Sequence, residues 1–267
     1  MSAATPATLE RVAAIAREAG REILEVYAAG PVAPTAKADA SPLTAADLRA
    51  HRLIVQRLNE LTPRLPVLSE EAADIPFAVR SQWQRYWLVD PLDGTREFLS
   101  RNGEFTVNIA LIEAHAPALG VVHVPVTDTC YRGLPGEGAW RGRGDAPGER
   151  ISVAARSATP PRVVGSRSHR GDSLDAFLGR LGEHELVAIG SSLKFCRVAE
   201  SEADVYPRLG PTSEWDTAAA HAVLVAAGGA VSALDGTALA YNTREQLLNP
   251  FFVAFGPRDR DWLALLR

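Results

Sequence analysis

The sequence contains little cysteine: Cys130 and Cys196 are the two cysteines among 267 residues. Each lies in an apolar run, and no Cys-x-x-Cys spacing occurs. A disulfide framework and a zinc site are therefore not expected. We interpret the two cysteines as buried free thiols of a protein in a reducing compartment.

Long hydrophobic runs and a basic excess are missing as well. No apolar stretch is long enough to span a membrane, and the first residues lack the basic and apolar segments of a signal peptide. The formal net charge is −4, which does not favour general binding to nucleic acid. We therefore expect a cytoplasmic protein without an integral membrane segment or a nucleic-acid partner. A peripheral position on the inner membrane stays open, as does the choice between monomer and homodimer.

Hydrophobic residues make up 46% of the chain, which predicts a globular fold. In the first half, helices come first and strands follow. Helices are expected at 7–29 and, capped by Thr44, up to about Leu61; strands are expected at 66–69, 86–90, 105–111, 119–126 and 129–134. In the second half, helices and strands alternate. Helices are expected at 172–181, 193–200 and 215–227, and strands at 163–164, 186–189, 205–209 and near Val231 and Phe252.

This order of elements predicts an α/β protein whose first lobe is of the α+β type. We place an antiparallel-rich lobe with most candidate metal ligands at 1–145, and an α/β lobe with the candidate substrate residues at 146–267. The two lobes would form one structural unit with the site between them. The stretch 136–150 is dense in glycine and charge, and we interpret it as turns or a lobe boundary. No βα unit surrounds its glycines, so a dinucleotide-binding turn is not expected there.

Two aspartates lie where a buried strand is expected to end. In Trp87-Leu88-Val89-Asp90-Pro91-Leu92-Asp93-Gly94-Thr95, proline fixes the chain direction and Asp93 follows Asp90 by three positions. α/β proteins tend to place their sites at the carboxyl ends of strands. An ordinary Asp-Gly turn has the same residues, so this string alone does not separate a site from a turn.

Two further acidic residues favour the site. Glu70 follows the expected strand 66–69, and Asp216 opens an apolar helix. A solvated loop would explain Glu70 alone, and a helix N-cap would explain Asp216 alone. Together with Asp90 and Asp93 they could form an all-oxygen cluster without His or Cys, which suits Mg²⁺ and argues against zinc. Clustered carboxylates also need cations to offset their mutual repulsion.

These motifs carry a family resemblance. Glu70-Glu71, the string from Asp90 to Thr95, and Trp215-Asp216-Thr217-Ala218-Ala219 resemble the signatures of the inositol monophosphatase superfamily. The longer strings 86–98, 102–111 and 190–196 are similar to those of its bacterial 3′(2′),5′-bisphosphate nucleotidases, and the similarity runs from about Thr44 to Phe252. It implies a layered α-β-α-β-α sandwich of the inositol monophosphatase and fructose-1,6-bisphosphatase type.

The resemblance also implies an activity: a magnesium-dependent, lithium-sensitive phosphatase. Its substrate would be the small-molecule nucleotide 3′-phosphoadenosine 5′-phosphate, hydrolysed to AMP and phosphate in sulfate assimilation and nucleotide recycling. Two or three Mg²⁺ ions would activate the attacking water and stabilise the leaving oxygen. The resemblance implies direct in-line attack by water without a covalent phosphoenzyme. The sequence shows no cysteine-based phosphatase loop and no Walker A motif.

Residue roles follow from the same resemblance. The metal ligands would be Glu70, Asp90, Asp93 and Asp216, with the carbonyl of Leu92. Asp47 and Thr95 would take a proton from the attacking water, and Glu70 would share in catalysis. Gly94 and Thr95 would also offer backbone N–H groups to the phosphate. Asp47 has a second interpretation, as the capping-box partner of Thr44.

The second half would bind the rest of the substrate. Ser191 and Lys194 lie three positions apart, on one face if a helix has begun there. Arg208 follows on a strand, and a guanidinium there would suit a phosphate. We expect Lys194 and Arg208 to hold the 5′-phosphate, with Asp216 and His169 also contacting the substrate.

Alternatives remain for these residues and for the whole chain. Lys194 and Arg208 could be solvated surface charges, which is the usual position of such residues. An inositol monophosphate or sugar phosphate phosphatase would share the same metal site. A regulatory binding protein with the same fold is the alternative outside the enzymes, although the complete set of candidate catalytic residues argues against it.

Overall fold

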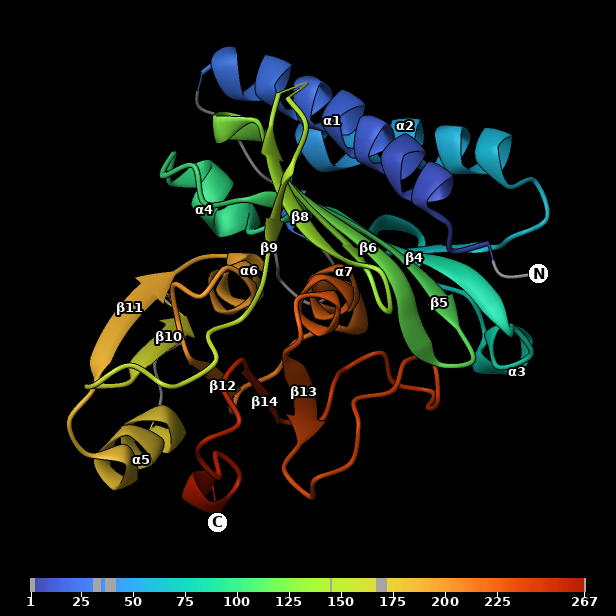
Figure 1. Ribbon diagram of the computed structural model, residues 1–267. Coiled ribbons are helices and arrows are strands. Elements are labelled where there is room, and N and C mark those ends of the chain that lie inside the picture. The colour runs from blue at the N-terminus through green and yellow to red at the C-terminus, as the bar shows by residue number, and fades with distance from the viewer. Residues whose placement is uncertain (1–2, 31–34, 37–41, 145, 167–171, 267) are drawn as a thin grey trace.

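The structure, a computed structural model, describes residues 3–30, 35–36, 42–144, 146–166 and 172–266. Helices and sheets alternate in layers, as Figure 1 shows: α1 and α2 lie over one face of a large sheet, α6 and α7 lie between that sheet and a smaller one, and α5 covers the far side of the smaller sheet. This is the predicted α-β-α-β-α sandwich.

The elements of the first half are two long helices followed by a meander of strands. They are α1 (Pro6–Ala28), β1 (Thr35–Ala36), β2 (Pro42–Leu43), α2 (Ala45–Leu61), β3 (Val67–Ser69), the 3₁₀ turn η1 (Glu70–Ala72), α3 (Phe77–Arg80), β4 (Arg85–Asp93), α4 (Thr95–Leu99), β5 (Thr106–Glu113), β6 (Ala116–Val124), the 3₁₀ turn η2 (Pro125–Thr127), β7 (Thr129–Leu134), β8 (Gly138–Arg143) and β9 (Glu149–Ile151).

The elements of the second half alternate, as expected. They are β10 (Arg162–Ser166), α5 (Asp172–Leu181), β11 (Glu185–Ile189), α6 (Leu193–Ala199), β12 (Val205–Arg208), α7 (Glu214–Ala226), β13 (Ala230–Ala233), β14 (Phe252–Phe255) and the 3₁₀ turn η3 (Ala264–Leu266).

The larger sheet has the order β3-β4-β5-β6-β7-β8-β9. Its strands pair antiparallel from β4 onward, whereas β3 pairs parallel with β4. Both faces are covered by helices, so its central strands are buried along nearly their whole length. The parallel pairing of β3 and β4 brings Glu70 beside Asp90, because Ser69 pairs with Val89 and each acidic residue is the next one along its chain segment.

The smaller sheet has the order β11-β10-β12-β14-β13. Strands β10, β11 and β12 run parallel, and β14 pairs antiparallel with both β12 and β13. α7 packs against β5, β6 and β7 of the larger sheet and also against β13. The two sheets therefore share one helical layer, which places the start of α7 close to the end of β4. The division of the chain at residue 145 stays a prediction.

Two parts of the sequence prediction were wrong. The glycine-rich stretch 136–150 was predicted as turns, yet it contains strands β8 and β9, which extend the larger sheet. The strand predicted at 119–126 ends at Val124, because Pro125 lacks the N–H that a sheet ladder needs and begins the turn η2. The short helices α3 and α4 were not predicted at all.

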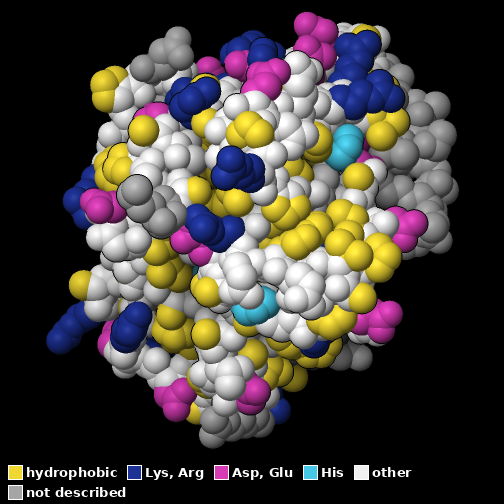
Figure 2. Space-filling view, turned by 90° about the vertical axis from the view of Figure 1, so that its right-hand side faces the viewer, with side chains coloured by type: hydrophobic (Ala, Val, Ile, Leu, Met, Phe, Trp, Pro, Cys, Tyr) yellow, Lys and Arg dark blue, Asp and Glu magenta, His cyan; other side chains and the backbone are white. Residues whose placement is uncertain are grey.

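The surface carries both signs of charge. Basic and acidic side chains both reach the face shown in Figure 2, together with a band of hydrophobic side chains, in keeping with the small net charge of −4. Within the described ranges, the longest apolar helical segments fall short of what crossing a bilayer requires.

Candidate active site

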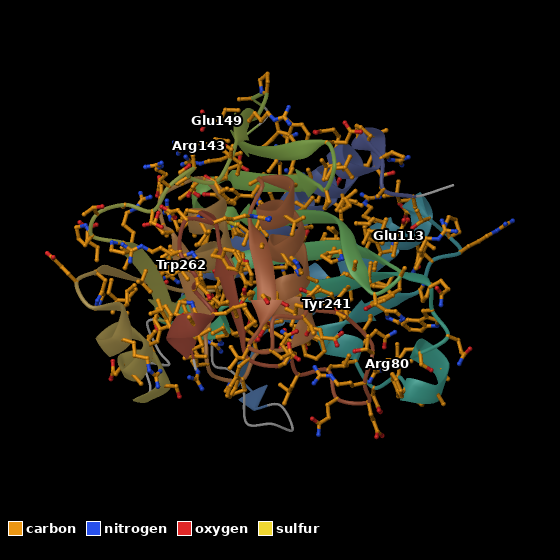
Figure 3. The ribbon with its side chains drawn as sticks, turned by 60° about the horizontal axis from the view of Figure 1, so that its bottom comes forward. Arg80, Glu113, Arg143, Glu149, Tyr241 and Trp262 are labelled. Atoms are coloured by element: carbon orange, nitrogen blue, oxygen red, sulfur yellow. The ribbon has the colours of Figure 1, made fainter. Side chains whose placement is uncertain are left out.

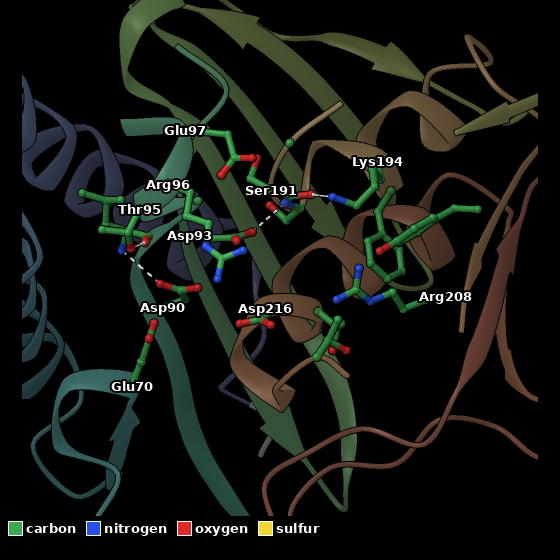
Figure 4. A pocket seen from close by; sticks show the side chains of 18 residues that line it. Glu70, Asp90, Asp93, Thr95, Arg96, Glu97, Ser191, Lys194, Arg208 and Asp216 are labelled. Atoms are coloured by element: carbon green, nitrogen blue, oxygen red, sulfur yellow. Dashed lines mark hydrogen bonds between the residues drawn. The ribbon is translucent and has the colours of Figure 1, made fainter. Parts of the chain in front are cut away.

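A cavity of about 270 Å³ lies where the two sheets and their shared helical layer meet. Its walls come from the end of β4, the start of α4, the segment before α6, the end of β12 and the start of α7. Figure 4 shows Glu70, Asp90 and Asp93 on one side of it and Lys194 and Arg208 on the other, with Asp216 between them and Arg96 beside the carboxylates. The lining residues are Glu70, Asp90, Leu92, Asp93, Gly94, Thr95, Arg96, Glu97, Gly190, Ser191, Ser192, Lys194, Phe195, Tyr206, Arg208, Thr212, Asp216 and Thr217.

Asp90 and Asp93 lie on either side of an irregularity in β4. The register with β5 shifts between them, so that Asp90 pairs with Asn108 and Asp93 with Thr106. The Asp90 side chain accepts a hydrogen bond of 3.0 Å from the amide of Leu92, which fixes the local turn. Gly94 then adopts a φ of 89°, a left-handed conformation that favours glycine, and α4 begins at the next residue.

The other two carboxylates arrive from different elements. Glu70 opens the 3₁₀ turn directly after β3. Asp216 occupies the third position of α7, where its Oδ2 accepts a 2.9 Å hydrogen bond from the amide of Ser213, the N-cap residue. Asp216 is therefore the capping-box partner of Ser213 and not itself the N-cap. The Asp216 side chain also lines the cavity, and this hydrogen bond does not use its Oδ1.

The carboxylates lie close enough to raise one another's pKa values. Burial raises the pKa of Asp90 well above its usual range, and Glu70, Asp93 and Asp216 raise it further. Burial raises the pKa of Asp93 to about 6, against the opposing effect of the Lys194 ammonium. Burial, followed by Asp93 and Glu70, also raises the pKa of Asp216. Burial and mutual repulsion thus disfavour the ionised forms of these carboxylates, and a bound cation would stabilise them.

The donor set fits a hard cation. In the part of the chain that the structure describes, no three His, Cys, Asp or Glu residues converge tightly enough to enclose an ion as the side chains stand. Mg²⁺ does not require such a cage, since it commonly keeps several waters and binds through one or two carboxylates. Oxygen donors at a shared, negatively charged cavity are compatible with that mode, and the individual ligand assignments stay predictions.

Asp47 has the geometry for both of its predicted roles. It is buried, and its Oδ2 accepts hydrogen bonds from the amide of Thr44 at 2.8 Å and from the Thr44 hydroxyl at 2.5 Å. This completes the predicted capping box of α2. The hydroxyl of Thr95 lies 3.4 Å from the second oxygen, Oδ1. One carboxylate thus links a helix start to the rim of the cavity.

Asp93 is held by two donors. The amide of Ser192 donates to Asp93 Oδ2 at 2.5 Å, and the side-chain Nδ2 of Asn108 donates to the same oxygen at 3.2 Å. Sequence reasoning gave neither residue a role. The available signal was an amide side chain, Asn108, within an otherwise apolar buried strand, because such a group needs a partner.

Lys194 lies at the cavity but is not a surface charge. Its side chain is buried, and its ammonium donates to the carbonyls of Ile189 and Ser191. Burial lowers its pKa to about 8, and the Asp93 carboxylate opposes that effect. The alternative of a solvated lysine is therefore wrong, and the ammonium lines the cavity beside Ser191.

Arg208 lies at the same end of the cavity, at the end of β12. One terminal nitrogen of its guanidinium donates to the carbonyl of Pro211. Its Nε–H is buried and makes no hydrogen bond within the described residues, while the guanidinium also neighbours the Tyr206 hydroxyl. A buried donor without a partner is unfavourable unless a ligand supplies an acceptor.

Buried hydrogen bonds connect the first residue of α7, Glu214, to Asn242 and Arg80. The Arg80 guanidinium donates to the side chain of Asn242 at 2.5 Å and to the backbone of Arg244 at 3.0 Å, and the amide of Asn242 donates to Glu214 at 2.8 Å. Figure 3 labels Arg80 and also Tyr241, whose hydroxyl lies 3.2 Å from the hydroxyl of Thr217 in α7. These contacts fix the first turn of α7, which also contains Asp216.

The structure brings nearly all predicted site residues to this cavity. Glu70, Asp90, Leu92, Asp93, Gly94, Thr95, Ser191, Lys194, Arg208 and Asp216 line it, and Asp47 contacts it through Thr95. His169 lies outside the described residues. Their assigned roles stay predictions.

Comparison with known proteins gives consistent results. The model of the "Inositol monophosphatase family" matches residues 6–258. A curated relative from Salmonella typhimurium, the 3′(2′),5′-bisphosphate nucleotidase CysQ, is 55% identical over 246 residues, covering 91% of this chain and 98% of the relative.

Solved structures agree with this result. CysQ from Bacteroides thetaiotaomicron, described as a bacterial member of the inositol monophosphatase family, superposes with a TM-score of 0.81 at 43% identity, covering 95% of this chain and 98% of that one. An inositol monophosphatase from Anabaena reaches a TM-score of 0.75 at 23% identity over 97% and 94% of the two chains, a likeness of fold alone. The chain belongs to the inositol monophosphatase family.

Proposed function

We propose that the protein is a magnesium-dependent 3′(2′),5′-bisphosphate nucleotidase that hydrolyses the 3′-phosphate of 3′-phosphoadenosine 5′-phosphate, giving AMP and phosphate. The proposal agrees with the activity named for the Salmonella typhimurium relative, which is 55% identical over nearly its whole length. In this role the chain would act in sulfate assimilation and nucleotide recycling.

The observation that carries the proposal is the distribution of charge inside one cavity. Asp90 and Asp93 lie at one side with Arg96 beside them, Lys194 and Arg208 lie at the other, and Asp216 lies between the two. A substrate with two phosphates matches both sides: one phosphate reacts at the carboxylate side with bound cations, and the other meets the guanidinium and ammonium. A monophosphate would leave the unpartnered Nε–H of Arg208 without an acceptor.

The protein residues have separate tasks in the reaction. Bound Mg²⁺ would lower the pKa of the attacking water and stabilise charge on the leaving 3′-oxygen. The attacking water would give a proton to the Thr95 hydroxyl as that hydroxyl gives its own proton to Asp47 Oδ1, which lies 3.4 Å away. The amides of Gly94 and Thr95, at the left-handed turn and the first position of α4, would donate to the scissile phosphate.

Phosphate release across a substrate panel tests the proposal. The panel comprises 3′-phosphoadenosine 5′-phosphate, 3′-phosphoadenosine 5′-phosphosulfate, inositol 1-phosphate and fructose 1,6-bisphosphate, each assayed with Mg²⁺ and with excess chelator. We expect the highest kcat/KM on one of the two adenosine nucleotides, and no turnover with chelator. A preference for inositol 1-phosphate or the sugar bisphosphate would replace the proposed function with the alternative phosphatase.

A further inference from the structure

A chain of buried hydrogen bonds joins the two sides of the cavity. The hydroxyl groups of Thr106 and Ser192 lie 2.9 Å apart, the Ser192 hydroxyl donates to Asn108 Oδ1 at 2.8 Å, and Asn108 Nδ2 donates to Asp93 Oδ2 at 3.2 Å. The amide of Ser192 reaches the same carboxylate oxygen at 2.5 Å. Because Asp93 can only accept when ionised, the Asn108 amide must turn its NH₂ group toward it.

The register of the larger sheet explains why these residues meet. Thr106 is the cross-strand partner of Asp93, and Asn108 is the partner of Asp90. The register shifts between the two aspartates, and the Asp93 carboxylate accepts a hydrogen bond from Asn108, although Thr106 is its cross-strand partner. The two polar residues of β5 thus stand beside the two carboxylates that the proposed function assigns to metal binding.

Water cannot readily replace these contacts. Thr106, Asn108 and Ser192 are exposed by only 0%, 1% and 2%. Removing one partner from such a buried set leaves another polar group unsatisfied, and without Asn108 the Asp93 carboxylate keeps only the Ser192 amide as a donor among these contacts.

The segment that contains Ser192 also forms the opposite side of the cavity. Ser191 has a φ of 46°, an uncommon conformation for a residue with a side chain, and Glu104 accepts a hydrogen bond of 2.7 Å from the amide of Gly190. The Lys194 ammonium donates to the carbonyls of Ile189 and Ser191. The position of the ammonium and the direction of the Ser192 amide therefore depend on one constrained segment, 189–194.

We propose that Asn108 and Ser192 are positioning residues that tie Asp93 to segment 189–194, so that cation binding at the carboxylates and phosphate binding at Ser191 and Lys194 strengthen each other. The proposal rests on the proposed function. A cation on Asp93 restrains the Ser192 amide, and a phosphate on Lys194 restrains the same segment from the other side. Each ligand thus lowers the entropy cost of ordering segment 189–194 that the other ligand would otherwise pay. Linkage requires this effect on the two binding free energies to be equal.

The test uses the complete protein and a ligand that cannot reach the cations through its sugar. 2′,3′-Dideoxyadenosine 5′-phosphate carries the 5′-phosphate but no 2′- or 3′-oxygen. Calorimetric titrations measure Mg²⁺ binding without nucleotide, and nucleotide binding with and without Mg²⁺. The variants are Asn108→Leu, which removes the hydrogen bonds of Asn108 to Asp93 and Ser192 and leaves the Ser192 amide on Asp93, Ser192→Ala, which keeps that backbone amide, and Thr106→Val, which removes the outermost hydroxyl.

A matched control is Ser232→Ala. Ser232 is another buried hydroxyl, 9% exposed, which donates to the carbonyls of Ala233 and Thr237 away from the cavity. This variant reports what the loss of a buried hydroxyl does to folding alone. The series Thr106→Val and Ser192→Ala also keeps the test available if Asn108→Leu does not fold.

In the wild type, Mg²⁺ should tighten nucleotide binding roughly 5- to 150-fold, the usual range of coupling between sites. Asn108→Leu should weaken Mg²⁺ binding roughly 10- to 100-fold, as loss of a residue that orients a metal ligand usually does. It should also bring the nucleotide affinities with and without Mg²⁺ closer together. The effects should decrease from Asn108→Leu through Ser192→Ala to Thr106→Val, and Ser232→Ala should change neither quantity.

Two results would overturn the inference in different ways. If the wild type binds both ligands and the substitutions leave Mg²⁺ affinity and coupling unchanged, or alter them no more than Ser232→Ala, the positioning role is wrong while the proposed function stands. If the wild type binds neither Mg²⁺ nor the nucleotide, the proposed function fails, and the inference fails with it.

Discussion

The hydroxyl of Thr95 lies 3.4 Å from Oδ1 of Asp47, although 48 positions separate the two residues in the chain. The other oxygen of Asp47 caps α2 through Thr44. The α2 start is thereby connected to the turn that follows β4, and the capping interaction and the proposed proton transfer use different atoms of one carboxylate.

Because the roles use different oxygens, Asp47→Asn should separate them. The loss of a positioned proton acceptor typically reduces the rate by about 10²–10⁴-fold. Loss of a helix cap typically costs only about 1 kcal/mol of stability. We expect kcat to fall within that range while the variant still melts cooperatively, as measured by phosphate release and thermal unfolding.

The N-cap of α1 provides the comparison for Asp47. Thr5 accepts a 3.1 Å hydrogen bond from the amide of Thr8 far from the cavity, so Thr5→Ala should lower stability without changing kcat. An Asp47→Asn protein that loses stability in the same way but retains the wild-type kcat would restrict Asp47 to capping.

Asp93→Asn should remove most of the activity and raise the Mg²⁺ concentration needed for what remains. The substitution keeps the shape of the side chain but removes charge from a cluster in which neighbouring carboxylates need a cation. Phosphate release measured against Mg²⁺ concentration checks this. Asp235→Asn, in an exposed turn where the side chain accepts from Thr237, should behave like the wild type. Near-normal turnover of Asp93→Asn at saturating Mg²⁺ would remove Asp93 from the metal ligands.

The sequence, with the family resemblance it carries, was sufficient to predict the layers and ten of the eighteen residues that line the cavity, because the informative residues lie at the ends of strands and starts of helices. It could not predict how Asp93 is held. The Ser192 amide reaches Asp93 from 99 positions away, and such a contact depends on the packing of two sheets on one helical layer. Lys194 was predicted at the correct place, but its hydrogen bonds to Ile189 and Ser191 depend on the left-handed conformation of Ser191. The strand β8 was missed because its glycines are typical of turns.

Acidification should destabilise the protein through His221. Burial lowers the pKa of this residue to about 4, and its Nδ1 lies 2.9 Å from the Tyr241 hydroxyl. A histidine in the unfolded chain has a pKa of about 6.5. The unfolded state therefore takes up a proton first as the pH falls from about 6.5 to about 4, and folding stability decreases over that window.

His221→Asn isolates this contribution because asparagine keeps an acceptor for Tyr241 but does not titrate. Thermal unfolding of both proteins between about pH 7.5 and pH 4.5 measures the difference. We expect the melting temperature of the wild type to fall more steeply than that of the variant. Parallel curves would show that His221 does not contribute to acid sensitivity.

Selection of a second phosphate by Arg208 is the central claim, and the ratio of two specificity constants tests it most directly. The quantity is kcat/KM for 3′-phosphoadenosine 5′-phosphate divided by kcat/KM for adenosine 3′-phosphate, in the wild type, in Arg208→Glu and in Arg180→Glu, an exposed charge reversal on α5. We predict a wild-type ratio well above one that Arg180→Glu preserves and Arg208→Glu lowers, by roughly tenfold for each 1.4 kcal/mol of lost interaction. Equal losses on both substrates in Arg208→Glu would contradict the claim, because Arg208 would then not recognise the 5′-phosphate.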